Sequence, residues 1–155
     1  LKLIIAPHVI DENHLVEIIR KLKRPYVRYT RADEKNVRKA DCLIIDCFGL
    51  LSSIYRYGEI AYIGGGFGVG IHNTLEAAVY GIPVVFGPKY QKFQEAIQLL
   101  EAKGAFSIKD YEELKTLLDR MLADEAFLHE VGMNAGNYVT GNAGATDKIL
   151  SMINF

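Results

Sequence analysis

Short apolar segments alternate with amphipathic segments along most of the chain. The apolar segments have the composition of buried strands, and they cover residues 1–6, 26–30, 43–46, 60–63, 84–86 and 106–108. Apolar residues recur with a helical period in residues 11–23, 51–57, 74–80 and 91–102, and again from Tyr111 onward, with breaks near Asp124 and Gly141. Residues 31–40 are polar and irregular. Unbroken apolar strands that alternate with amphipathic helices are typical of a parallel sheet covered by helices on both faces. The pattern therefore predicts an α/β, Rossmann-like fold.

The most distinctive segment follows the fourth of these strands. Five glycines lie between Gly64 and Gly70, and Asn73 then opens a helical pattern that ends at Gly81. Glycines let the backbone turn tightly and let a ligand approach the main chain, and the start of a helix attracts anions. The segment therefore favours a phosphate site, with tight packing of the glycines as the alternative. It matches neither the dinucleotide-binding fingerprint nor the Walker loop.

Three segments fall at the carboxyl ends of strands of the predicted sheet. They are Pro7–His8, residues 46–50 and residues 64–76. Ligands of such sheets bind at the carboxyl ends of the strands, so we expect these segments to converge on one edge.

Glu76 has two interpretations. Asn73 followed three residues later by Glu76 matches a capping box, in which each side chain bonds a backbone donor. Alternatively, the carboxylate of Glu76 accepts hydrogen bonds from the hydroxyls of a ribose. The local sequence does not favour one over the other.

Other chemistries have less support. His8, Asp11, Glu12 and His14 have no standard metal spacing, and the two acidic residues suit the first turn of a helix. Asp46 has the position of a phosphoacceptor in a receiver domain, but such domains need an acidic pair after the first strand. We predict no metal, no cofactor and no catalytic residue within this chain.

Composition narrows the class of protein. The chain has 155 residues, of which 50% are hydrophobic and 24% charged, as in one soluble globular domain. Its 18 basic and 19 acidic residues give no electrostatic footprint for nucleic acid.

Cys42 and Cys47 are expected to be two buried thiols without a disulfide. There is no signal peptide or apolar run of membrane-spanning length, and the chain, which starts within a strand, is expected to be part of a longer protein.

Taken together, the blocks resemble the C-terminal domain of the bacterial 3-deoxy-D-manno-octulosonic acid (Kdo) transferases, which are glycosyltransferases of the two-domain GT-B architecture. The family patterns G-G-S-F, G-G-H-N-P-L-E and G-x-P-V are similar to residues 64–67, 70–76 and 81–84, and G-P with a later Phe is similar to residues 87–88 and Phe93. The pattern D-x-M-G-E-L is echoed by residues 46–51, and P-R-H-P-E by Pro7–His8.

The resemblance implies that residues 1–155 are a single Rossmann-like domain that binds a nucleotide-sugar donor, CMP-Kdo, and that it is excised from a longer two-domain enzyme. The cytidine pocket would be lined by Pro7, His8, Phe48, Gly49 and Leu50. The phosphate and the ribose would be met by Gly65, Gly66, His72, Asn73, Thr74, Leu75 and Glu76, with Glu76 on the sugar hydroxyls.

The resemblance also implies what the longer enzyme does. It would transfer Kdo with inversion, without a metal, to a lipid A precursor at the cytoplasmic face of the inner membrane in lipopolysaccharide synthesis. The general base, the acceptor site and any membrane anchor would belong to the N-terminal domain. The fragment is therefore expected to bind the donor and not to catalyse.

The chain departs from the family pattern at three of these positions. His8 stands for Arg, Leu50 for Glu and Thr74 for Pro. The first change removes a bidentate cation, which is not a conservative change near a phosphate. Two other functions stay open, namely the donor domain of another GT-B enzyme that uses a UDP-sugar, and a non-catalytic doubly wound module whose glycine loop serves packing.

Overall fold

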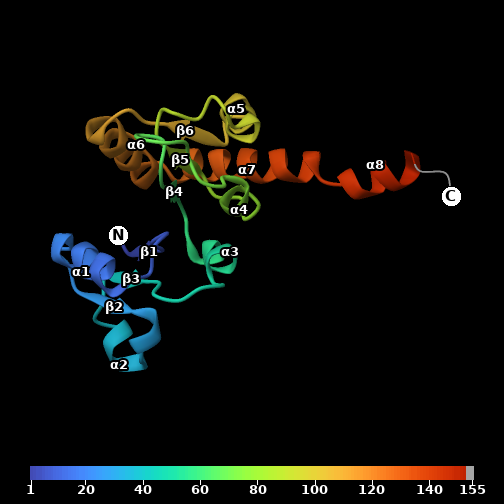
Figure 1. Ribbon diagram of the computed structural model, residues 1–155. Coiled ribbons are helices and arrows are strands. Elements are labelled where there is room, and N and C mark those ends of the chain that lie inside the picture. The colour runs from blue at the N-terminus through green and yellow to red at the C-terminus, as the bar shows by residue number, and fades with distance from the viewer. Residues whose placement is uncertain (153–155) are drawn as a thin grey trace. The chain divides into compact units, whose positions relative to one another are not determined.

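The computed structural model describes residues 1–152, except for the side chains of residues 145–148 (Figure 1). The chain divides into two compact units, Leu1–Ile54 and Tyr55–Phe155. Each unit is built on a parallel three-stranded sheet.

The first unit has a sheet of order β1-β3-β2. Its elements are β1 (Leu3–Ile5), α1 (Glu12–Lys21), β2 (Tyr26–Arg28), a 3₁₀ turn (Tyr29–Arg31), α2 (Glu34–Val37), β3 (Cys42–Ile44) and α3 (Leu51–Ile54). The central strand β3 pairs Ile44 with Ile5 on one side and with Arg28 on the other. All three strands run in the same direction, so their carboxyl ends share one edge of this sheet.

Helix α1 covers one face of the first sheet. Its apolar residues Leu15, Ile18 and Ile19 recur at helical spacing and pack against Cys42 and Ile44 of β3. The side chain of Asp11 caps this helix by accepting a hydrogen bond of 3.0 Å from the backbone N–H of His14.

The second unit has a sheet of order β4-β5-β6. Its elements are a 3₁₀ turn (Tyr55–Tyr57), β4 (Ala61–Ile63), α4 (Leu75–Ala78), β5 (Val84–Phe86), α5 (Gln94–Glu101), β6 (Ala105–Ser107), α6 (Tyr111–Ala123), α7 (Glu125–Asn142) and α8 (Ala145–Met152). The central strand β5 is buried along its whole length.

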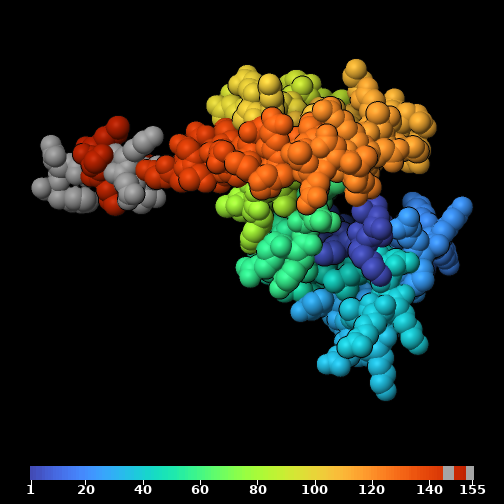
Figure 2. Space-filling view, turned by 180° about the vertical axis from the view of Figure 1, so that it is seen from behind, coloured from blue at the N-terminus to red at the C-terminus, as the bar shows by residue number. Residues whose placement is uncertain are grey.

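Small residues let the helices of the second unit pack closely on its sheet. Ala77 and Ala78 of α4, Ala96 of α5 and Ala135 of α7 are buried in one core cluster with Phe86 of β5. The carboxyl end of α7 extends past α4, α5 and α6 (Figure 2).

The α/β class, the parallel strands and the flanking helices that the sequence predicts are confirmed. The strands lie in two sheets, whereas the sequence pattern suggested one. The helix expected over residues 74–80 has only four residues, and the helix expected over residues 91–102 begins at Gln94. That residues 1–155 form one domain stays a prediction.

Two further expectations concern the cysteines and membrane spans. Cys42 and Cys47 are both free, but Cys47 is only half-buried because it lies in the loop after β3. Among the helices of the described residues, none has the length and apolar character needed to cross a membrane.

Candidate functional site

The loops at the carboxyl edge of the first sheet hold five of the predicted site residues. Pro7 and His8 follow β1, and Phe48, Gly49 and Leu50 follow β3. The side chain of Phe48 is 85% exposed, which is unusual for a large aromatic residue. Gly49 has a φ of +86°, and no described atom lies within 4 Å of where its Cβ would be. Conformation, and not lack of space, therefore requires a glycine at position 49.

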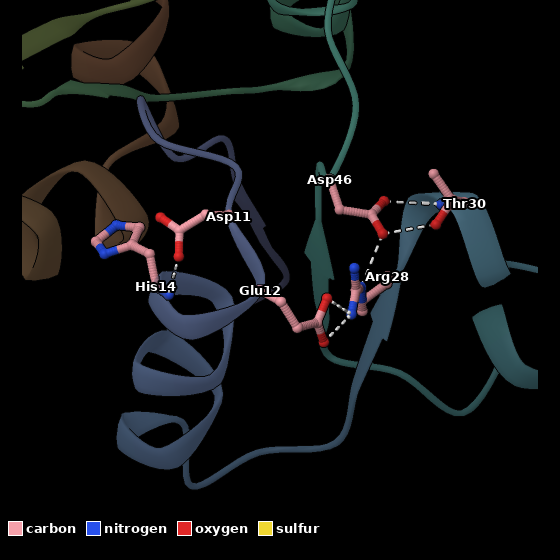
Figure 3. A network of polar contacts seen from close by, with 6 residues as sticks. All are labelled: Asp11, Glu12, His14, Arg28, Thr30 and Asp46. Atoms are coloured by element: carbon pink, nitrogen blue, oxygen red, sulfur yellow. Dashed lines mark hydrogen bonds and ion pairs between the residues drawn. The ribbon is translucent and has the colours of Figure 1, made fainter.

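A buried carboxylate joins the end of β2 to the end of β3 (Figure 3). The side chain of Asp46 is 1% exposed. Its Oδ2 accepts hydrogen bonds from Thr30 Oγ1 at 2.6 Å and from Arg28 Nε at 2.8 Å. Its Oδ1 accepts a hydrogen bond from the backbone N–H of Thr30 at 2.9 Å. Burial alone would raise the pKa of this carboxyl, but the bonds from Thr30 and Arg28 outweigh it and lower the pKa to about 2.

Arg28 extends this network to the start of α1 (Figure 3). Its Nη1 donates to both carboxylate oxygens of Glu12, at 2.8 and 2.9 Å. Hydrogen bonds to Glu12 and to Asp46 raise the pKa of the guanidinium. Arg28 is therefore held between two carboxylates, one exposed and one buried.

The network shows that Asp46 is not an accessible phosphoacceptor. Both of its oxygens accept hydrogen bonds from the protein, and its side chain is hidden from solvent. No local pattern indicates its partners, because Arg28 and Thr30 lie 18 and 16 residues from it in the chain.

The glycine segment of the second unit folds into a narrow turn. Gly65 and Ile71 form an isolated antiparallel bridge. The backbone N–H of His72 donates to the carbonyl of Gly64 at 3.2 Å, and that of Gly66 donates to the carbonyl of Val69 at 3.2 Å. The turn brings the residues after Gly70 back beside the end of β4.

Packing accounts for several of the glycines in this turn. A Cβ on Gly66 would come within 2.9 Å of the backbone of Gly87, and a Cβ on Gly70 would overlap the ring of Phe93. Gly65 and Gly66 also have φ values of +89° and +79°. Gly68 is different, since no described atom lies within 4 Å of its added Cβ. Close packing, the alternative to ligand approach, therefore explains Gly66 and Gly70 without a ligand.

The capping-box interpretation of Asn73 and Glu76, one of the two that the sequence left open, is wrong. The N-cap of α4 is Thr74, whose side chain makes no capping bond. Asn73 instead accepts a hydrogen bond at 2.9 Å from the backbone N–H of Leu75, as in an Asx turn. Its amide Nδ2 donates to Glu76 Oε1 at 3.0 Å. Glu76 is therefore positioned by a side chain, and its second carboxylate oxygen is not used in this bond.

Glu76 also lies near Tyr55. Burial, and then the negative charge of Glu76, raise the pKa of the Tyr55 hydroxyl. Because α4 has only four residues, its dipole is small, and the anion attraction expected of a longer helix is reduced.

Thr74 is the unusual residue of this segment. It is 1% exposed, and within the part of the chain that the structure describes its Oγ1 has no hydrogen-bond partner. A buried hydroxyl without a partner costs about 1–3 kcal/mol. The sequence could not reveal this, because burial and pairing depend on residues distant in the chain.

Within each unit the structure brings the predicted site residues together. Five of them lie at the carboxyl edge of the first sheet, and the other seven lie in the glycine turn of the second unit and at the start of α4. The described residues contain no group of three or more His, Cys, Asp or Glu side chains arranged to hold a metal ion.

Comparison with known proteins identifies relatives of the chain. No family model matches it. It is 37% identical over 125 residues to the 3-deoxy-D-manno-octulosonic acid transferase of Aquifex aeolicus (strain VF5), covering 79% of this chain and 34% of that protein. It is 33% identical over 116 residues to the enzyme of the same name from Rickettsia bellii (strain RML369-C), covering 73% of this chain and 28% of that protein. The chain therefore spans about a third or less of the length of these relatives.

Two solved structures have a similar fold. The C-terminal CMP-Kdo binding domain of WaaA from Acinetobacter baumannii matches with a TM-score of 0.74 at 20% identity, covering 88% of this chain and 72% of that one. The C-terminal domain of the group 1 glycosyl transferase LpcC from Francisella tularensis matches with a TM-score of 0.57 at 15% identity, covering 87% of this chain and 65% of that one. At these identities the matches establish the fold, whereas the relation to the transferases rests on the sequence matches. The chain therefore belongs to the family of the 3-deoxy-D-manno-octulosonic acid transferases and has the fold of the C-terminal CMP-Kdo binding domain of WaaA.

Proposed function

We propose that residues 1–155 are the donor-binding domain of an inverting glycosyltransferase, which binds CMP-Kdo and transfers Kdo to a lipid A precursor in lipopolysaccharide synthesis. The observation that carries this proposal is the 37% identity to a Kdo transferase over 79% of the chain. The fold shared with a CMP-Kdo binding domain supports it. The longer enzyme would act at the cytoplasmic face of the bacterial inner membrane.

The donor carries a phosphodiester, a ribose and a cytosine, and the chain offers groups suited to each. We assign the phosphate and the ribose to Gly65, Gly66, His72, Asn73, Thr74, Leu75 and Glu76. The cytidine contacts are assigned to Pro7, His8, Phe48, Gly49 and Leu50. The exposed ring of Phe48 suits an apolar or stacking contact with a base.

Glu76 is assigned to the ribose hydroxyls. The Asn73 amide fixes one of its oxygens at 3.0 Å, which orients the carboxylate before a ligand arrives. A carboxylate with a free lone pair accepts hydrogen bonds from a vicinal diol. This assignment replaces the capping interpretation of Glu76, because its side chain bonds the side chain of Asn73 and not a backbone donor.

The buried hydroxyl of Thr74 is assigned to the donor phosphate. Thr74 Oγ1 is buried and has no partner in the free protein, so it gains a full hydrogen bond when the start of α4 opens and an anionic oxygen reaches it. Fixed hydrogen-bond donors stabilise the negative charge that develops on the departing CMP, and this lowers the barrier to glycosyl transfer. The acceptor hydroxyl attacks the anomeric carbon of Kdo while the bond to the CMP oxygen breaks, and its proton goes to a base outside this chain.

The test is calorimetric titration of the chain with CMP, UMP and AMP. We expect saturable binding with a preference for CMP, and a loss of about tenfold in affinity in Glu76→Ala. Glu112→Ala is the matched control, because Glu112 is also the second residue of its helix and is exposed. It should bind CMP as the unchanged chain does.

Two results would favour other functions. Preference for UMP would indicate the donor domain of an enzyme that uses a UDP-sugar. A folded chain that binds none of the three nucleotides, with Glu76→Ala changed only in stability, would favour a non-catalytic module in which the glycine turn serves packing, as Gly66 and Gly70 already do.

A further inference from the structure

The loop after β3 is held at its two ends. At one end, Asp46 is bonded to Thr30 and Arg28. At the other, the carbonyl of Leu50 accepts hydrogen bonds from the backbone N–H groups of Ser53 and Ile54, at 3.1 and 2.9 Å, and from Ser53 Oγ at 3.0 Å.

Packing does little to hold the residues between these ends. Phe48 is 85% exposed. Gly49 has no described atom within 4 Å of its added Cβ, and its positive φ is open to glycine at little cost. A loop with so few contacts depends on its anchors for a defined conformation.

Both carboxylate oxygens of Asp46 are already bonded within the protein, so we assign it no contact with the ligand. Its side chain is 1% exposed, and its three hydrogen bonds come from Arg28 at the end of β2 and from Thr30 in the turn that follows (Figure 3). Through Arg28 it is also coupled to Glu12, the first residue of α1, which follows the loop of Pro7 and His8. One carboxylate thus connects the segments that follow all three strands of the first sheet.

We propose that Asp46 is a positioning residue that preorganises the Phe48–Gly49–Leu50 loop, with Arg28 relaying the same constraint to the loop of Pro7 and His8. This inference rests on the proposed function, since these are the residues assigned to the cytidine. A loop whose conformation is already fixed in the free protein loses less conformational entropy when the ligand binds.

The test compares Asp46→Asn with Asp41→Asn. Asp41 lies at the opposite end of β3, where it pairs with Lys2 at 2.9 Å on the surface. Both changes remove one negative charge from a hydrogen-bonded aspartate beside the same strand. We would record the amide signals and hydrogen exchange of Phe48, Gly49 and Leu50 without nucleotide, and then titrate CMP at a temperature where all proteins are folded.

For Asp46→Asn we expect shifted loop amides, faster exchange in the loop and a loss of about tenfold in CMP affinity. Asp41→Asn should retain the loop signals and bind CMP as before. A folded Asp46→Asn chain with unchanged loop amides or unchanged CMP affinity would overturn the inference, because a purely structural role lowers the melting temperature without altering binding by the folded protein.

If Asp46→Asn does not fold, Thr30→Val replaces it. That change removes the hydroxyl donor at 2.6 Å and keeps the backbone donor, so a smaller effect in the same direction is expected. If the unchanged chain binds no CMP, the proposed function fails, whereas the loop measurements still decide whether Asp46 holds the loop.

Discussion

The backbones of Gly66 and Gly87 are in direct contact. A Cβ added to Gly66 would come within 2.9 Å of the backbone of Gly87, and a Cβ added to Gly87 would come within 2.8 Å of the backbone of Gly66. This contact joins the turn after β4 to the end of β5, 21 residues further along the chain. The turn is thereby fixed against the central strand of the second sheet.

Gly66→Ala should destabilise the chain by about 2–4 kcal/mol. The added methyl group clashes with the backbone of Gly87, and a residue with a side chain is strained at a φ of +79°. Gly68→Ala is the control, since nothing described lies within 4 Å of its added Cβ and its φ is not positive. Urea unfolding measures both variants, and equal stabilities would contradict the packing role of Gly66.

Acid should weaken the chain through Asp46. The pKa of Asp46 is about 2 in the folded protein, below its ordinary value of 3.8. Because the pKa is lower in the folded than in the unfolded protein, Asp46 stabilises the fold at pH values above its ordinary pKa. That stabilisation is lost as the pH falls from about 4 toward 2. For this shift the loss is about 2 kcal/mol.

Urea unfolding at pH 5 and at pH 2.5 tests this prediction. The unchanged chain should lose more stability between the two pH values than Asp46→Asn, because the other carboxyls contribute equally to both. Equal losses in the two proteins would show that Asp46 is not ionised and hydrogen-bonded as the structure has it.

The alternation of strands and helices was sufficient to predict the class of the fold, because burial of parallel strands imposes a local pattern. The break near Asp124 was predictable for a different reason, because a helix cap depends on residues close in the chain. There Asp124 ends α6 and caps α7 by accepting a hydrogen bond from the N–H of Phe127, a contact within one turn of helix.

Contacts between distant segments could not be predicted. Arg28 and Asp46 are 18 residues apart, and no local pattern relates them. In the same way the sequence could not separate Gly66, where an added Cβ would clash with Gly87, from Gly68, where an added Cβ would meet no described atom within 4 Å. The site residues were found by resemblance to a family, whereas the network that supports them became visible only in three dimensions.

The charge of Glu76 should be measurable at Tyr55. Burial and the Glu76 carboxylate both raise the pKa of the Tyr55 hydroxyl. Glu76→Gln should therefore lower that pKa while leaving it above its ordinary value, since the effect of burial remains. NMR titration of the tyrosine ring signals reports each residue separately. Tyr62 is an internal control, because burial alone raises its pKa. If the pKa of Tyr55 is the same in Glu76→Gln as in the unchanged chain, the Glu76 carboxylate does not lie near the Tyr55 hydroxyl.

Thr74→Val should separate stability from binding. Valine has nearly the shape of threonine but no hydroxyl, so it removes the buried Oγ1 that has no partner among the described residues. The free chain should be as stable as before or more stable by about 1 kcal/mol, because no desolvated donor remains. CMP should bind about tenfold more weakly, if Oγ1 donates to the phosphate as proposed. Urea unfolding and calorimetry on the same preparation measure the two effects.

Thr74→Ser keeps the hydroxyl and should retain CMP affinity while losing stability, because it leaves the space of one buried methyl group. A Thr74→Val chain that binds CMP with undiminished affinity would remove Thr74 from the phosphate site and leave its buried hydroxyl as a cost of the fold.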